Sequence, residues 1–241
     1  MFDLLTKPVS ALLRMLPSQC AVCRNWSAQD ICPPCLASFA AKHHRCLGCA
    51  IRLPSASRQC GACLRSPPSL DHAITAADYA FPWNELIQRF KFHDAIDLSQ
   101  SLAERIAQTV LDTQELPSID WLLPVPLAQQ RLQERGYNQT ELLTKHLSTL
   151  LACPTRSDWL LRQRHTPDQL TLARDARAAN VRHVFAIEPK LRDQIQNARV
   201  AVIDDVMTTG ATLNEIARVL KQAGAAHVQG WVIARTPNPA G

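Results

Sequence analysis

The placement of the cysteines constrains the fold of this 241-residue chain more than any other feature of its sequence. Eight of the nine cysteines lie in the segment 20–63, and all eight belong to pairs whose members are separated by two residues. These pairs are Cys20/Cys23, Cys32/Cys35, Cys46/Cys49 and Cys60/Cys63. A short segment with so many thiols is unable to bury a sufficient hydrophobic core, so metal ions or disulfides must hold it together.

The compartment decides between disulfides and metal ions. Asp3, Lys7, Pro8 and Arg14 interrupt the apolar N-terminus and argue against a signal peptide, so we expect a cytoplasmic protein. Cytoplasmic thiols stay reduced, which favours metal binding. No apolar run reaches the roughly eighteen residues that a membrane helix needs, so we expect no membrane insertion.

Four cysteine pairs predict two structural zinc sites, each closed by four cysteine ligands. We expect sequential closure, of the first pair with the second and the third with the fourth, because short loops close at a lower entropic cost. Interleaved closure, of the first pair with the third and the second with the fourth, is the alternative. Gly48 and Gly61 lie inside two of the pairs and permit the positive φ that such turns often use. His43 and His44 are alternative ligands.

The formal net charge of +5 is unevenly distributed. It is +6 over residues 1–65, −6 over 66–120, +5 over 121–200 and zero over 201–241. Two zinc sites with four thiolates each would lower the total to +1, because each site contributes −2. The basic region that remains, 121–200, indicates an anionic partner.

After the cysteines, strands and helices alternate, which predicts an α/β domain with a parallel sheet. Strands are expected at 73–80, 121–126, 200–203 and 227–234. Helices are expected at 86–92, 98–111, 140–151 and 213–223, the last of them ended by Gly224. We therefore expect an N-terminal extension (1–19), a double zinc ribbon (20–65) and an α/β domain (66–241).

Two adjacent carboxylates, Asp204 and Asp205, follow the strand at 200–203 and precede the hydroxyl-rich segment 208–212. Open α/β sheets bind ligands at the carboxyl ends of their strands. Backbone N–H groups at the start of the next helix suit a phosphate, and carboxylates accept hydrogen bonds from sugar hydroxyls or act through Mg²⁺. The pattern predicts a sugar-phosphate site, and the alternative is a capped turn with two surface acids.

The segment 200–212 closely resembles the phosphoribosyl pyrophosphate (PRPP) motif of type I phosphoribosyltransferases. The resemblance implies that Asp204 and Asp205 bind the ribose hydroxyls, that 208–212 bind the 5′-phosphate, and that Mg²⁺ accompanies PRPP. The implied PRPP-binding residues are Asp204, Asp205, Val206, Met207, Thr208, Thr209, Gly210, Ala211 and Thr212.

From Cys20 onward the chain resembles the ComF family, which includes ComFC and GntX-type proteins. Besides the cysteine pairs, the matching residues are Phe90-Lys91-Phe92, Val125-Pro126-Leu127, Arg135-Gly136-Tyr137-Asn138-Gln139, Gln169, Leu172, Arg177, Asn180 and Phe185. The resemblance implies a parallel sheet of the type I phosphoribosyltransferase kind, flanked by helices and preceded by a small double zinc ribbon. It also implies a role in the uptake and use of external DNA.

Basic residues are candidates for the pyrophosphate of PRPP. Arg131 and Arg135 are expected in a loop after the strand at 121–126, the region of a pyrophosphate loop. Arg135, followed by Gly136, is the first choice, because a guanidinium fork suits phosphate oxygens. The alternative is a solvated helix face. Gln169, Arg177 and Asn180 are candidates on a loop that closes over the site and excludes water, and the alternative is that they order the loop itself.

Lys91 is the nucleic-acid candidate, because Phe90 and Phe92 on either side would stack on bases while the lysine meets phosphate. The alternative is an amphipathic helix with both aromatic side chains in the core.

Three functions remain open from the sequence. The first is an enzyme that transfers the phosphoribosyl group of Mg·PRPP to a nitrogen nucleophile and releases pyrophosphate; no catalytic residue is assigned for it. The second is a sensor of PRPP or a nucleotide that also binds single-stranded DNA. The third is an adaptor that docks other DNA-uptake proteins through its zinc ribbon.

Overall fold

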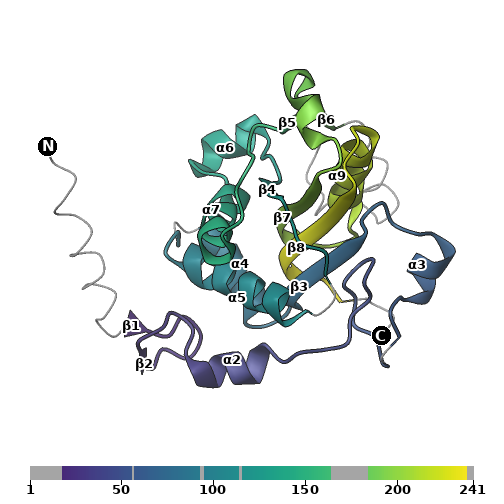
Figure 1. Ribbon diagram of the computed structural model, residues 1–241. Coiled ribbons are helices and arrows are strands. Elements are labelled where there is room, and N and C mark those ends of the chain that lie inside the picture. Colours follow the sequence, from purple (N-terminus) through teal and green to yellow (C-terminus); the bar gives the residue numbers. More distant parts are fainter. Residues whose placement is uncertain (1–17, 56, 93–94, 114–115, 164–183, 238–241) are drawn as a thin grey trace, which may run out of the picture. The chain divides into compact units, whose positions relative to one another are not determined.

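The structure, a computed structural model, describes residues 18–55, 57–92, 95–113, 116–163 and 184–237 (Figure 1). The chain forms two compact units, of which the first ends at Lys42 and the second begins at His43. The third and fourth cysteine pairs thus belong to the same unit as the sheet. The predicted boundary after residue 65 stays a prediction.

The first unit contains very little regular structure. Strands β1 (Ser18–Gln19) and β2 (Trp26–Ser27) pair antiparallel, and helix α2 (Pro33–Phe39) follows. Pro33 occupies the first helical position, where its missing N–H and fixed φ are favourable. The buried hydrophobic residues among 18–42 are Ile31 and three cysteines, Cys20, Cys32 and Cys35. The cysteines therefore form the centre of this unit.

A four-stranded parallel sheet forms the centre of the second unit. Its strands, in the spatial order β3-β8-β7-β4, are β3 (His72–Asp78), β8 (His227–Arg235), β7 (Arg199–Met207) and β4 (Trp121–Pro124). All three pairings are parallel. The parallel sheet, with its flanking helices and the two cysteine groups, confirms the predicted α/β class.

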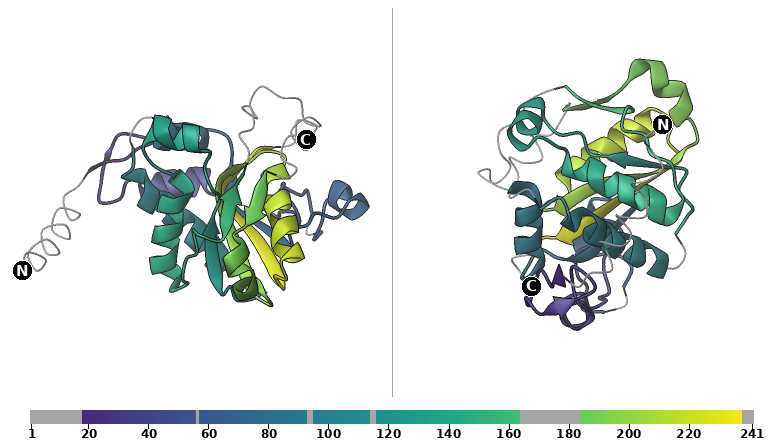
Figure 2. Two further views of the ribbon diagram at one scale, coloured as in Figure 1. Left: turned by 90° about the horizontal axis from the view of Figure 1, so that it is seen from above. Right: turned by 90° about the vertical axis from the view of Figure 1, so that its left-hand side faces the viewer.

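Helices cover both faces of the sheet. Helices α5 (Leu98–Asp112) and α7 (Gln139–Leu151) pack against each other on one face, and α9 (Ala211–Gln222) packs on the other (Figure 2). The remaining elements are α3 (Gly61–Arg65), α4 (Trp83–Phe92), α6 (Gln129–Arg135), the antiparallel pair β5 (Leu160–Arg162) and β6 (Phe185–Ile187), and the 3₁₀ helix η2 (Pro189–Ile195). Within the described ranges, no helix combines the length and the apolar character needed to cross a bilayer.

Two local predictions were wrong. Strand β7 continues to Met207, so Asp204 and Asp205 lie within its last part, because its pairing with β8 extends that far. Arg131 and Arg135 lie on α6 and not in a loop. The sequence of α6 consists of good helix formers, and the helix ends at Gly136, which has a φ of 75°.

Candidate functional site

A cavity of about 440 Å³ lies at the carboxyl end of the sheet. It is lined by the end of β7, the loop that follows β4, the first turns of α7 and α9, and residues of α4, α6 and β5. Eight of the nine residues of the implied PRPP motif line it, Thr209 being the exception. Lys91, Arg131 and Arg135 line it as well, so the fold brings these predicted site residues together.

The turn between β7 and α9 has the geometry of a phosphate-binding loop. Gly210 immediately precedes α9 with a φ of 83°, and a Cβ at this position would lie 2.5 Å from the Met207 side chain. Only glycine therefore fits there without strain. Thr209 Oγ1 accepts a hydrogen bond from Ala211 N at 3.3 Å. The N-terminus of a 12-residue helix, which carries partial positive charge, meets the cavity at this turn.

The two acidic residues of β7 have different environments. Asp205 Oδ1 lies 2.8 Å from Lys91 Nζ, and the Asp205 N–H donates a hydrogen bond to Asp204 Oδ1 at 2.8 Å. Burial and the charge of Asp205 raise the pKa of Asp204 to about 7. The hydrogen bond from the Asp205 N–H and the charge of Lys91 act to lower this pKa but do not outweigh them. A ligand that donates hydroxyl groups, or a cation, would favour the ionised pair.

The raised pKa predicts that Asp204→Asn stabilises the ligand-free protein at neutral and alkaline pH. In the folded state Asp204 keeps a proton that an aspartate in the unfolded chain loses near pH 3.8. The free energy of unfolding therefore decreases as pH rises from about 4 to 7, and asparagine removes this decrease. Thermal unfolding at pH 5 and pH 8 measures the effect, with the exposed Asp193→Asn on η2 as control. An equal pH dependence of wild type and Asp204→Asn would contradict it.

Three guanidinium groups lie on the cavity wall. The Arg135 guanidinium stacks 4.6 Å from the centroid of the Phe92 ring. Burial, with the charge of Arg131, lowers the pKa of Arg135 and of Arg162. Because Arg131, Arg135 and Arg162 line the same cavity, this region suits an anion with several charges.

The two aromatic residues of the Phe90-Lys91-Phe92 segment have different environments, one in the core and one at the surface. Phe90 is fully buried against Tyr137, whose hydroxyl donates a hydrogen bond to the Phe90 carbonyl. Phe92 is 59% exposed, so the alternative with both aromatic side chains in the core was wrong for this residue. Helix α4 ends at Phe92, which places its ring beyond the buried face of the helix. The nucleic-acid role of Lys91, which is paired with Asp205, stays a prediction.

Gln139 is a site residue that had been noted only as part of a family match. It is the first residue of α7, lines the cavity and is 1% exposed, and its Nε2 has no hydrogen-bond partner among the described residues. Its neighbours are held in place, since Asn138 Nδ2 and Thr140 Oγ1 both donate to the Val125 carbonyl, at 3.2 and 2.7 Å. A buried donor without a partner is costly and indicates a missing ligand or water.

Some predicted site residues lie outside the described part of the chain. These are Gln169, Arg177 and Asn180. Strands β5 and β6, which precede and follow that part, pair with each other, and Arg162 at the end of β5 reaches the cavity. Arg162 was not singled out, since it is one of many arginines in a basic stretch of sequence.

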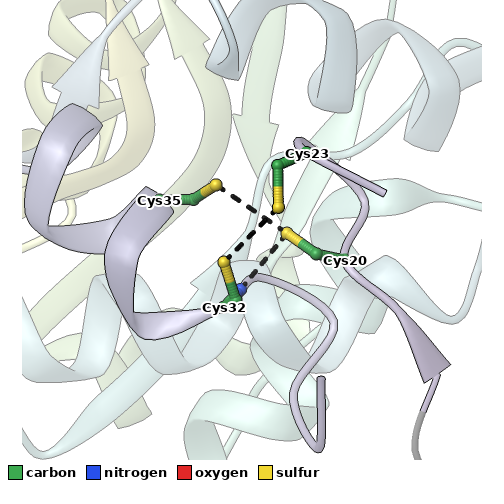
Figure 3. A group of neighbouring side chains, drawn as sticks. All are labelled: Cys20, Cys23, Cys32 and Cys35. Carbon is green, nitrogen blue, oxygen red and sulfur yellow. Dashed lines mark hydrogen bonds between the residues drawn. The ribbon is translucent and has the colours of Figure 1, made fainter. Parts of the chain in front are cut away.

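The cysteines form two groups in the order that sequential closure predicts. Cys20, Cys23, Cys32 and Cys35 form the first cluster, and Cys46, Cys49, Cys60 and Cys63 form the second. Within each cluster the four sulfur atoms lie within 4.8 Å of one another. Figure 3 shows the four sulfur atoms of the first cluster directed toward a common centre.

The sulfur geometry fits zinc. A tetrahedral site with Zn–S bonds of about 2.3 Å has sulfur atoms about 3.8 Å apart. The Cys20–Cys35 and Cys23–Cys32 sulfur atoms are 3.9 and 3.7 Å apart, and those of Cys49 and Cys60 are 3.7 Å apart. Both clusters are therefore suited to hold a divalent ion with four thiolate ligands.

Backbone N–H groups support thiolates in both clusters. The amides of Cys32 and Cys60 donate to the sulfur atoms of Cys20 and Cys46, each at 3.3 Å. Burial raises the pKa of Cys20, but backbone hydrogen bonds outweigh it and lower the pKa to about 6. Burial and the neighbouring cysteines raise the pKa of Cys35 to about 12. Four thiolates therefore coexist in a cluster only with a cation between them.

The conformation of the cysteine turns differs from the expectation in one respect. Positive φ angles occur at Arg24 (65°) and Ala50 (56°), each directly after the second cysteine of a pair, and not at Gly48 or Gly61. Gly48 has another role, because a Cβ there would lie 2.9 Å from Pro68 and 3.3 Å from the Cys63 sulfur. The close approach of the chain after α3 requires this glycine.

Comparison with known proteins identifies relatives over nearly the whole chain, although no family model matches it. It is 33% identical to the DNA utilization protein YhgH of Escherichia coli K12, over 92% of this chain and 98% of that protein. It is 36% identical to competence protein F of Haemophilus influenzae, over 79% and 84% of the two chains.

Solved structures with some similarity include phosphoribosyltransferases of low sequence identity. The adenine phosphoribosyltransferase of Leishmania donovani has a TM-score of 0.38 and 14% identity, over 68% of this chain and 70% of that one. The glutamine PRPP amidotransferase of B. subtilis has a TM-score of 0.39 and 17% identity, over 59% and 30%. The extent and identity of the sequence relatives show that the chain belongs to the ComF family of competence and DNA utilization proteins.

Proposed function

We propose that the cavity binds Mg²⁺ and PRPP, and that the protein acts in the uptake or use of external DNA. The observation that carries the proposal is the meeting of Asp204, Asp205 and the α9 N-terminus at one cavity. The carboxylates would accept hydrogen bonds from the ribose hydroxyls, and the 208–212 turn would bind the 5′-phosphate. The names of the sequence relatives support the role in DNA utilization.

The arginines of the cavity wall suit the pyrophosphate end of the ligand. Arg131, Arg135 and Arg162 line the same cavity as the acidic pair. In a transfer reaction a nitrogen nucleophile forms a bond to C1′ of the ribose while the bond from C1′ to the pyrophosphate oxygen breaks. The guanidinium groups would stabilise the negative charge that develops on the leaving pyrophosphate. Mg²⁺, bound to PRPP, would neutralise part of that charge.

A second candidate function is favoured by the exposed Phe92. This ring stands at the cavity beside the Arg135 guanidinium and follows Lys91. Exposed aromatic rings next to cations bind single-stranded nucleic acid by stacking on bases and pairing with phosphates. A protein of this kind would sense PRPP while it holds DNA, without turnover.

A titration with PRPP and Mg²⁺, in the presence and absence of single-stranded DNA, tests the proposal. Calorimetry is expected to detect PRPP binding to the cavity. Release of pyrophosphate with a nucleobase or nucleic-acid acceptor would identify an enzyme. PRPP binding without turnover across a broad acceptor panel would favour the sensor, and no PRPP binding would refute both. DNA affinity that decreases steeply with salt would indicate contacts to phosphates.

The buried Nε2 of Gln139, which has no partner in the described part of the chain, yields a separate prediction. Gln139→Met keeps the length of the side chain and removes the buried donor. We expect the free energy of unfolding of the ligand-free protein to rise by about 1 kcal/mol, because an unsatisfied buried group is removed. PRPP affinity is expected to fall about tenfold, since a hydrogen bond to the ligand is lost. Denaturant unfolding and calorimetry measure the two effects, and unchanged affinity would exclude a ligand contact.

A further inference from the structure

Arg235, the last residue of β8, connects the second cysteine cluster to the phosphate-binding turn. It is only 4% exposed. Its Nε donates to the Cys49 carbonyl at 2.8 Å, and its Nη1 donates to the carbonyls of Met207, at 3.1 Å, and Thr208. One buried guanidinium therefore bonds to Cys49 of the second cluster and also to Met207 and Thr208 at the end of β7.

Asn214 makes a second connection between the same two regions. It lies in the first turns of α9, where its Nδ2 donates to the Gly210 carbonyl at 3.0 Å. Its Oδ1 accepts a hydrogen bond from Ser69 N at 2.9 Å. Ser69 follows Pro68, which packs against Gly48 of the second cluster. The segment that leaves the cluster is thus tied to the start of the phosphate-binding helix.

The second cluster is also attached to the sheet itself. The Leu47 carbonyl accepts a hydrogen bond from Ala73 N at 2.6 Å, and Arg45 pairs with Asp78 at 2.8 Å. Ala50 is fully buried in the core that also contains Leu70. A metal ion in the cluster would fix the turn from Cys46 to Cys49. The contacts above would then fix this turn relative to the sheet.

We propose that Arg235 is a positioning residue through which metal in the second cluster sets the affinity of the phosphate-binding turn. A buried guanidinium stays in place only while its acceptors surround it, because an unsatisfied buried donor is costly. Without metal the Cys49 carbonyl is no longer fixed and Arg235 reorients toward water. The Thr208 carbonyl then loses its guanidinium donor, while the Met207 carbonyl keeps the Thr236 N–H at 3.1 Å. The inference rests on the proposed binding of PRPP.

The first cluster lacks this connection in the described part of the chain. The hydrogen bonds that the sulfur atoms of its cysteines make there stay within residues 20–35. It belongs to the other compact unit. Loss of its metal is therefore expected to leave the phosphate-binding turn unchanged, which makes it the natural internal control.

Four full-length variants test the proposal by zinc content, PRPP calorimetry and amide hydrogen exchange of residues 207–212. Arg235→Lys is expected to keep both zinc ions but to raise the Kd for PRPP about tenfold and to accelerate exchange in this segment, because an ammonium does not reproduce the guanidinium fork. Arg199→Lys, at the opposite end of β7, is the matched control and is expected to behave as wild type. Cys60→Ser is expected to lose one zinc ion and to reproduce both effects of Arg235→Lys. Cys23→Ser is expected to lose one zinc ion with neither effect.

Wild-type Kd and wild-type exchange in Arg235→Lys would overturn the proposal, as would equal effects of Cys60→Ser and Cys23→Ser. If Cys60→Ser does not fold, Arg235→Lys alone decides, since it keeps all eight cluster cysteines. If the wild-type protein does not bind PRPP, the proposed function fails. The exchange of residues 207–212 still tests the connection in that case, because it needs no ligand.

Discussion

Asp205→Ala is expected to raise the dissociation constant for PRPP about 100-fold. The substitution removes a charged acceptor for the ribose hydroxyls, and one hydrogen bond to a charged group contributes about 1.5–3 kcal/mol. It also leaves Lys91 without its partner at 2.8 Å, so that the lysine becomes free to turn toward solvent. Calorimetry with PRPP and Mg²⁺ measures the loss, and single-stranded DNA binding is expected to persist.

Two controls make the result specific to the ribose site. Glu141→Ala removes an acidic residue on the exposed surface of α7, where it pairs with Lys145, and should not change PRPP affinity. Thermal unfolding of Asp205→Ala should resemble that of wild type or improve at pH 8, since removal of the neighbouring charge lowers the pKa of Asp204. PRPP affinity equal to that of wild type would eliminate the assignment of Asp205 to the ribose.

Loss of metal from the first cluster is expected to unfold residues 18–42 as a unit. Its two strands contain two residues each and its helix contains seven, so backbone structure contributes little. Zinc bound by four cysteines contributes about 10–16 kcal/mol to the folding of small domains. Cys20→Ser is expected to reduce the zinc content from two ions to one and to make this unit sensitive to protease.

The rest of the chain provides the reference for this experiment. The unit 43–241 is expected to retain its second zinc ion, its cooperative unfolding transition and its PRPP affinity. Limited proteolysis followed by mass spectrometry locates the cleavage sites. Protease resistance of residues 18–42 in a protein with one zinc ion would show that packing, and not the metal, holds the first unit together.

The helices and strands that depend on local sequence patterns were predicted correctly. The spacing of apolar residues located the four strands of the sheet and helices α5, α7 and α9, because each element must bury one face. Gly224, with a φ of 103°, follows α9 as predicted, since few other residues adopt this conformation at a helix end. The extent of β7 was underestimated, because pairing with β8, and not local hydrophobicity, determines where that strand ends.

Site residues whose importance depends on distant contacts were missed. Arg235 looks like an ordinary charged strand end in the sequence, yet its partner Cys49 lies 186 residues earlier in the chain. Gln139 resembles any polar helix residue until its burial is known and its Nε2 is seen to lack a partner within the described ranges. Phe90 and Phe92 look equivalent, but the former lies in the core and the latter at the cavity.

The sequence by itself determined the two cysteine clusters and the acidic turn at 204–212. Both consist of residues close together in the chain, so their chemistry follows from spacing and from the cost of closing short loops. Only the tertiary structure decided that Lys91 pairs with Asp205, and that the second cluster is joined to the turn through Arg235. These contacts form when parallel strands align their carboxyl ends, which brings together side chains that no local pattern relates.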